Sequence, residues 1–141
     1  MCLVATKQNI LNAERTRKTP GKIYAWKVLC KNQNAIYSAI FQHKWDIGWN
    51  RSDRRTIRLY KYESGTLKTY GDCDIDEGIH VYLRKQDAID ACHRSLSSSY
   101  VVVRVECHNK HLVARGKRWL VKEAVYMKVF LSREEYKNAT K

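Results

Sequence analysis

Basic and aromatic residues occur together in two short stretches of this 141-residue chain. The first stretch combines four arginines with two tryptophans: Arg51, Arg54, Arg55, Arg58, Trp45 and Trp49. The second contains Arg115, Lys117, Arg118 and Trp119. Guanidinium groups bind phosphates through paired hydrogen bonds, and aromatic rings stack on unpaired bases. These residues are therefore candidate contacts to single-stranded or structured nucleic acid.

The chain as a whole is strongly basic. It has 27 Lys+Arg residues against 14 Asp+Glu residues, a formal net charge of +13. Because unpaired charge is costly to bury, this surplus must lie mainly on the surface, where it attracts nucleic acid, another polyanion or an acidic protein surface. A second interpretation remains open, in which the basic side chains keep the protein soluble and the tryptophans belong to the core.

Cysteine, histidine and acidic residues are the candidates for metal binding. Cys107, His108 and His111 lie close together, but zinc sites are usually built from two short paired spacings, and the chain has no C-x-x-C pair. The carboxylates in residues 72–77 alternate as at the start of a calcium loop, without the glycine and the distal glutamate that such a loop needs. We predict no metal ion and no cofactor, and an exposed acidic loop at residues 72–77.

The elements that must position these residues are mostly strands. β-branched and aromatic content or period-two alternation predicts strands at residues 23–30, 55–62, 78–83 and 100–107, with one or two more in 119–131. Residues 35–41 are a short strand or a helical turn, and residues 66–70 return from 55–62 as a hairpin. Helices are predicted at residues 86–95 and at 132–138, the latter starting with a Ser132/Glu135 capping box.

This order of elements predicts one α+β domain over residues 21–141. Runs of strands outnumber strand–helix alternations, which favours a bent mixed or mainly antiparallel sheet with two or three short helices. Residues 1–20 are polar, contain several cations and end in Thr-Pro-Gly, so they are interpreted as a basic N-terminal arm. Residues 108–118 are expected to form a basic connection.

The sequence shows no targeting signal, which favours an intracellular location. No apolar run approaches the ~20 residues that cross a bilayer, and the opening residues are too polar for a signal peptide. The five cysteines are scattered and odd in number, which suits a reducing compartment. We expect a cytoplasmic protein, or a virion-associated one if the chain is viral, with no membrane partner.

Segments spread over most of the chain resemble one family of small proteins. They are the opening MCLVA, the strand IYAWKVL, residues 38–48, EGIHVYLRKQDAIDA and YVVVRVECHNKHLVARGKRWLVKEAVYMKVF. That family is uncharacterised and spread among phages, giant viruses and bacteria, with an opening MCL, a Y-K-V-L strand, a G-F-H segment followed by D-A, and a late V-V-x-C strand. This chain differs in having Ile79 at the aromatic position and a more basic C-terminal third. The resemblance implies a viral or mobile-element context and no particular activity.

His80 has two interpretations. On a strand that precedes a helix it can bind a nucleotide or act as an acid or base, or it can be half-buried with a local partner. The segment GIHVY, the helix after it and the strand VVVRVEC also resemble the middle of the ADP-ribosyltransferase core. That resemblance implies an enzyme that uses NAD.

The same resemblance implies an Arg or His on an early strand and a glutamate on a late one. The early strand here offers Tyr24, Trp26 and Lys27 instead, and Glu123 is the available late glutamate. His80, Tyr24 and Glu123 are therefore the candidate catalytic residues.

Three functions follow, in order of preference. The first is a non-enzymatic basic accessory protein, encoded by a virus or mobile element, that engages nucleic acid or a nucleoprotein assembly. The second is an ADP-ribosyltransferase-like enzyme or nucleotide binder. The third is a structural or inhibitory protein that binds an acidic protein surface.

Overall fold

The computed structural model describes residues 3–38, 43–52, 62–63, 66–67, 73–75, 77–94 and 99–141. Its strands are β1 (Leu3–Ala5), β2 (Lys22–Asn32), β3 (Ala35–Ser38), β4 (Gly48–Arg51), β5 (Tyr62–Glu63), β6 (Thr66–Leu67), β7 (Cys73–Ile75), β8 (Ile79–Tyr82), β9 (Tyr100–His108), β10 (Leu112–Arg118), β11 (Val121–Tyr126) and β12 (Lys128–Leu131). Its helices are α1 (Lys7–Arg17), α2 (Lys85–Arg94) and α3 (Arg133–Thr140), with a 3-10 turn at Asn109–His111.

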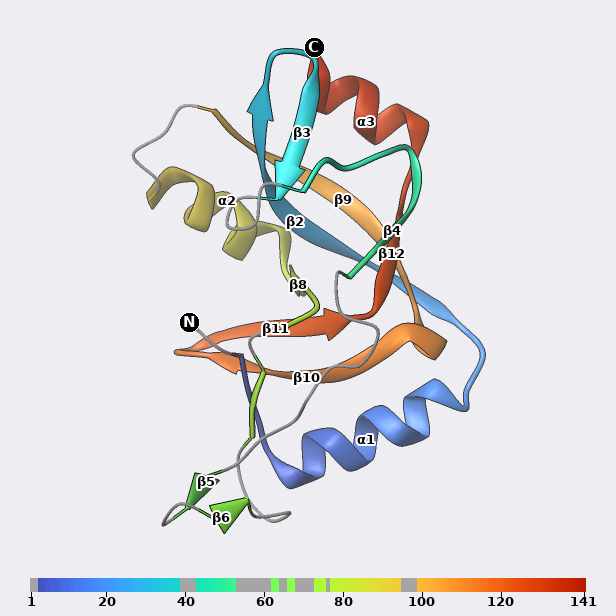
Figure 1. The fold of residues 1–141 in the computed structure, drawn as a ribbon, viewed down its shortest axis with the longest axis vertical. Helices are drawn as coiled ribbons and strands as arrows, with labels where there is room; N and C mark the ends of the chain where they lie inside the picture. The colour runs from blue at the N-terminus through green and yellow to red at the C-terminus, as the bar shows by residue number, and fades with distance from the viewer. Residues whose placement is uncertain are drawn as a thin grey trace.

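One antiparallel sheet organises the described residues. Its strand order is β4-β12-β9-β2-β8-β11-β10-β1-β7, with β3 added to β2, and β5 pairs separately with β6. In Figure 1, β10 and β11 run across the direction of β2 and β9, so the sheet is strongly bent. The predicted class, a single α+β domain with a bent and mainly antiparallel sheet, is confirmed.

The pair β2–β9 forms the centre of the sheet. It runs without interruption from Lys22, opposite His108, to Cys30, opposite Tyr100. Alternate side chains such as Ala25, Val103 and Val105 are fully buried in the core. Because side chains alternate along a strand, the residues between them point to the opposite face. That opposite face carries the candidate site.

The helices cover parts of this bent sheet (Figure 1). α1 packs on β10 and β1, α2 on β2, β8 and β9, and α3 on β9 and β3. α3 begins as predicted, because Ser132 Oγ accepts a hydrogen bond from Glu135 N at 3.2 Å. In a full capping box the Glu135 carboxylate would also accept a hydrogen bond from the backbone N–H of Ser132. Here this carboxylate accepts a hydrogen bond from Arg104 N instead, at 3.1 Å. Glu135 therefore ties α3 to the edge of β9.

The prediction of an N-terminal arm is wrong for residues 3–17, which belong to the folded domain. Leu3 and Ala5 are fully buried where β1 lies between β10 and β7. The carbonyl oxygen of Leu112 accepts a hydrogen bond from Arg17 Nη1 at 2.9 Å, which holds α1 on β10. A three-residue strand is too short to show alternation in sequence, so its apolar residues carried no visible signal.

Two predicted connections are strands. Residues 73–75, expected to lie in an exposed acidic loop, form β7, and Ile75 is fully buried. Residues 112–118, expected in a basic connection, form β10, whose buried residues Leu112 and Ala114 are followed by the polar residues 115, 117 and 118. In both segments, charged neighbours hid the apolar residues that face the core.

The other predicted elements agree with the structure where it describes them. The strands at 23–30, 78–83 and 100–107 are β2, β8 and β9, and residues 119–131 contain β11 and β12. The helix at 86–95 is α2, displaced by one residue at each end. Residues 35–38 form β3, and residues 66–67 pair with 62–63. Residues 39–41, 55–61 and 68–70 lie outside the described residues.

Candidate nucleic-acid interface

Residues from four neighbouring strands form one row on the sheet face opposite the core. Tyr24 on β2 pairs with Glu106 on β9, Glu106 with Phe130 on β12, and Phe130 with Trp49 on β4. Residues directly paired in an antiparallel sheet point to the same side. Tyr24 and Trp49 are 46% and 44% exposed, so both ends of this row are open to solvent.

Cations lie beside this row on the same strands. Lys22 pairs with His108, and Lys128 pairs with Arg51. Arg104 lies two residues before Glu106 and therefore on the same side of β9. We call this surface the basic-aromatic face, and its members are Lys22, Tyr24, Trp49, Arg51, Arg104, Glu106, His108, Lys128 and Phe130.

Trp49 lies at the centre of an aromatic cluster on this face. Its ring centroid is 5.0 Å from that of His108, 5.6 Å from that of His111 and 5.4 Å from that of Phe130, all in edge-to-face arrangements. Lys128 Nζ lies 5.0 Å from the centroid of the Trp49 ring. The indole is therefore held in place by its neighbours while nearly half of it remains exposed.

Tyr24 has a similar environment on the neighbouring strands. Arg104 Cζ lies 4.5 Å from its ring centroid, and Lys22 Nζ lies 5.9 Å away. Lys22 Nζ also donates a hydrogen bond to Glu106 Oε1 at 3.0 Å, and His108 Nε2 lies 2.7 Å from the same oxygen. The hydrogen bonds from Lys22 and His108 lower the pKa of Glu106. Glu106 thus positions two basic side chains on the face.

His111 lies behind Trp49 in a strongly cationic environment. Its Nε2 atom is buried and has no hydrogen-bond partner among the described residues. Burial is the main cause that lowers the pKa of His111, followed by Lys128, Lys110, His108 and Arg51. Since four basic side chains surround it, an anion placed here would be attracted from several directions.

The described residues of the first predicted cluster divide between two environments. Trp49 and Arg51 belong to the basic-aromatic face. Trp45, predicted to stack on bases, is only 4% exposed and packs in the core, so that prediction is wrong. A large indole gains more by burial than a solvent position allows. Arg54, Arg55 and Arg58 lie outside the described residues.

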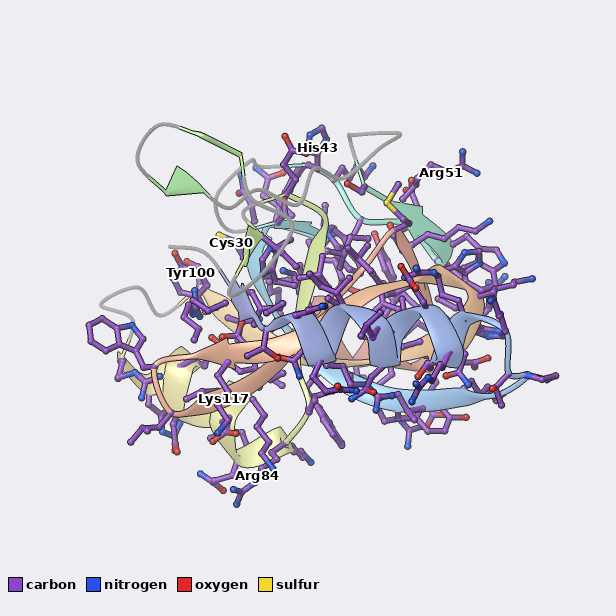
Figure 2. The ribbon with its side chains drawn as sticks, turned by 90° about the horizontal axis from the view of Figure 1, so that it is seen from below. Cys30, His43, Arg51, Arg84, Tyr100 and Lys117 are labelled. Carbon is purple, nitrogen blue, oxygen red and sulfur yellow. The ribbon has the colours of Figure 1, made fainter. Side chains whose placement is uncertain are left out.

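The second predicted cluster lies at the other end of the molecule. Lys117, Arg118 and Arg115 are on β10, and Trp119 is in the turn from β10 to β11. Figure 2 shows Arg51 and Lys117 on opposite sides of the view. Arg115 is half-buried, and its Nε atom is enclosed. Arg51 and Lys117 are therefore far apart in this view, and the two basic clusters do not form one continuous patch there.

A buried ionic cluster lies beneath the β10–β11 hairpin. Arg118 Nε lies 2.9 Å from Glu123 Oε2, and Arg118 Nη2 donates to the Tyr82 hydroxyl at 2.9 Å. Lys27 Nζ donates to the carbonyl oxygen of His80 at 2.8 Å. Burial lowers the pKa of Lys27 to about 8, an effect that Glu123 partly offsets. Burial raises the pKa of Glu123, while Arg118 and Lys27 oppose that rise.

The three candidate catalytic residues have separate contacts. The Tyr24 ring contacts the guanidinium of Arg104 on the basic-aromatic face. His80 Nε2 lies 3.0 Å from the carbonyl oxygen of Glu77. Glu123 is paired with Arg118. Within the part of the chain that the structure describes, these contacts anchor strands and turns, and none joins one of the three residues to another.

Sequence reasoning missed most of the basic-aromatic face. Lys22, Arg104, His108 and Lys128 come from β2, β9 and β12, which were recognised by their apolar residues. Their signal was present in the alternation, because Arg104 and Glu106 interrupt the apolar run of β9 at every second position. Alternation within a strand does not indicate which strands are neighbours in the sheet.

Cys107 also differs from the metal-site pattern. Its thiol is fully buried on the core side of β9, and burial raises its pKa to about 12, whereas His108 is on the opposite face.

No helix within the described ranges has the length and apolar character needed to cross a membrane. Comparison with protein families, curated proteins and solved structures finds no match to this chain. The function must therefore be inferred from the geometry of the site.

Proposed function

We propose that the chain is a non-enzymatic protein that binds single-stranded nucleic acid on the basic-aromatic face. The observation that carries this proposal is the strand register, which brings exposed aromatic rings and four cations to one side of β2, β9, β12 and β4. A positively charged surface with rings that stack on bases is the usual design of single-strand binding proteins. A viral or mobile-element context, and an intracellular location, remain part of this proposal.

The spacing of the two exposed rings suits an extended strand. Tyr24 and Trp49 are separated by three steps between neighbouring strands, and at ~4.8 Å for each step they lie about 14 Å apart. Bases that stack on each ring would therefore belong to different nucleotides of one strand. The sugar-phosphate backbone between them would cross β9 and β12, where the cations are.

The cations are already placed for that path. Arg104 and Lys128 each lie over one of the two rings, so each can contact a phosphate next to a stacked base. Glu106 would repel phosphate, but it holds Lys22 in position and is partly neutralised by it. Arg104 also has an acidic partner, since its Nε lies 4.0 Å from Glu135 Oε1. The surplus positive charge of the face therefore comes from Lys128 and Arg51, for which the described residues show no ion pair.

Replacing Trp49 with alanine should weaken binding of a single-stranded oligonucleotide roughly 5- to 150-fold, because one stacked base contributes about 1–3 kcal/mol. Fluorescence anisotropy of a labelled oligonucleotide measures this loss. Trp49→Phe keeps an aromatic ring and should retain most of the affinity. Leu11→Ala, at an exposed apolar residue of α1, is the matched control and should bind as the unaltered protein does.

If Trp49→Ala binds the oligonucleotide unchanged, the basic-aromatic face is not the binding site. Poly-glutamate distinguishes the third function, binding to an acidic protein surface. A polyanion without bases should lose little affinity on Trp49→Ala, since it cannot stack. Equal losses for poly-glutamate and the oligonucleotide would contradict base stacking.

Replacing Lys128 with glutamine should change the salt dependence of binding. Each phosphate contact on a single strand contributes about −0.7 to the slope of log K against log salt, so four cations predict a slope of about −3 and the variant a slope shallower by about 0.7. Titrations between roughly 50 and 200 mM salt measure it. Lys137→Gln on α3 removes a cation outside the face and should leave the slope unchanged. Absence of binding at low salt would end the proposal.

A further inference from the structure

The β10–β11 hairpin ends in two large apolar side chains that point into solvent. Trp119 is 82% exposed and Leu120 is 93% exposed. They are the two turn residues after the last paired positions of the hairpin, Arg118 and Val121. Neither side chain contributes apolar burial that would stabilise the fold. Their presence at this tip needs another explanation.

The backbone of this turn makes the choice of residue more unusual. Trp119 has a φ of 60°. In two-residue hairpin turns, a positive φ at the first position strongly favours glycine, asparagine or aspartate. A bulky side chain there costs about 1 kcal/mol or more. The indole is thus held at the tip against the local backbone preference, an observation that points to contact with a partner.

Two cations lie on one side of this hairpin just behind its tip, and an ion-paired arginine lies on the other. Lys117 and Lys122 are paired across the two strands, so they lie on one side of the ribbon. Arg118, the next residue on β10, points to the other side, where Glu123 and Tyr82 fix its guanidinium. Glu123 is buried, so its carboxylate faces the interior and not the tip.

The partner of such a tip must accept apolar side chains and carry negative charge beside them, where Lys117 and Lys122 lie. Nucleic acid has this chemistry, because its bases are stacked between two rows of phosphates. A two-stranded ribbon also fits the major groove of a duplex, which is about 12 Å wide. Proteins that distort nucleic acid insert apolar side chains between neighbouring bases.

We propose that Trp119 and Leu120 form a wedge that separates stacked bases where a duplex meets a single strand. This inference rests on the proposed function. Lys117, two residues before Trp119, and Arg51 of the basic-aromatic face lie on opposite sides of the view in Figure 2, so one nucleic acid would contact both regions through different segments. The single-stranded segment would occupy the basic-aromatic face, and the adjoining duplex would meet the hairpin. The substrate class is a duplex with a single-stranded overhang.

The test uses a duplex with an overhang that carries the fluorescent base 2-aminopurine at the junction. The unaltered protein should increase 2-aminopurine fluorescence on binding, because the base leaves the stack. The variant Trp119→Gly/Leu120→Ser should give no increase and should bind this substrate roughly 5- to 100-fold more weakly. Glycine suits the positive φ, so thermal unfolding should show that the variant is at least as stable as the unaltered protein.

A separate titration with a plain single strand distinguishes the two proposals. The hairpin variant should bind the plain strand unchanged, whereas Trp49→Ala should bind it roughly 5- to 150-fold more weakly. Retained binding with no fluorescence increase in the unaltered protein would overturn the wedge and leave the proposed function intact. Failure of the unaltered protein to bind the plain single strand would overturn the proposed function. Sedimentation with phosphatidylserine vesicles by the unaltered protein, but not by the hairpin variant, would assign the tip to a membrane surface and also overturn the wedge.

Discussion

Replacing Glu123 with alanine is expected to lower the free energy of unfolding by about 3–5 kcal/mol, as removal of one partner from a buried ion pair does. The Glu123 carboxylate is 2% exposed, and Arg118 Nε lies 2.9 Å from its Oε2 atom. Without it, the guanidinium of Arg118 and the ammonium of Lys27 lose the carboxylate that balances them. The same contacts join β10, β11, β8 and β2, so the loss affects the middle of the sheet.

Lys27 gives this prediction a characteristic pH dependence. Its pKa in the folded protein is about 8, and Glu123 contributes to keeping it that high. In Glu123→Ala the pKa of Lys27 falls further, so between the two pKa values the folded variant holds fewer protons than the folded unaltered protein. The unfolded chains titrate Lys27 alike, so the stability of the variant rises faster with pH. The deficit should therefore be smaller at about pH 9 than at about pH 7.

Urea unfolding at the two pH values measures both effects. Glu14→Ala removes an exposed carboxylate on α1 and should change stability by less than about 0.5 kcal/mol. The double variant Arg118→Met/Glu123→Leu replaces the whole pair by apolar groups and should be more stable than Glu123→Ala. A deficit below about 1 kcal/mol that does not depend on pH would show that the buried pair does not hold the hairpin.

Sequence patterns predicted the centre of the sheet and failed at its periphery for one physical reason. β2 and β9 are long and rich in β-branched residues, so their burial pattern is visible along the chain. β1 and β7 have three residues each, and their burial comes from pairing with each other and, for β1, with β10. The contacts that bury them are made between segments far apart in sequence, which local periodicity does not report.

The candidate site shows the same limit more sharply. Clusters along the chain grouped Trp49 and Arg51, which lie on one sheet face, but also included Trp45, which is in the core. The basic-aromatic face is built across strands. Its row from Tyr24 to Trp49 exists because β12 lies between β9 and β4, an order that nothing in the spacing of the residues indicates.

Gly116 shows how closely distant segments approach each other. A Cβ atom at this position would lie 2.2 Å from the carbonyl oxygen of Val4 and 2.9 Å from its carbonyl carbon. Both atoms belong to the backbone of β1, whose neighbours Leu3 and Ala5 are fully buried. The clash cannot be relieved by rotating a side chain, so β1 must move away from β10.

Gly116→Ala is therefore expected to destabilise the protein by about 2–4 kcal/mol, the upper range for overpacking of a core. Hydrogen exchange should show loss of protection first in residues 3–17, since β1 and α1 are the segments displaced. Gly48→Ala is the matched control, because Gly48 has a φ of +99° but no atom within 4 Å of its Cβ position. It should cost about 1–3 kcal/mol through backbone strain alone and leave β1 protected. Unchanged protection of residues 3–17 in Gly116→Ala would contradict the close approach of β1 and β10.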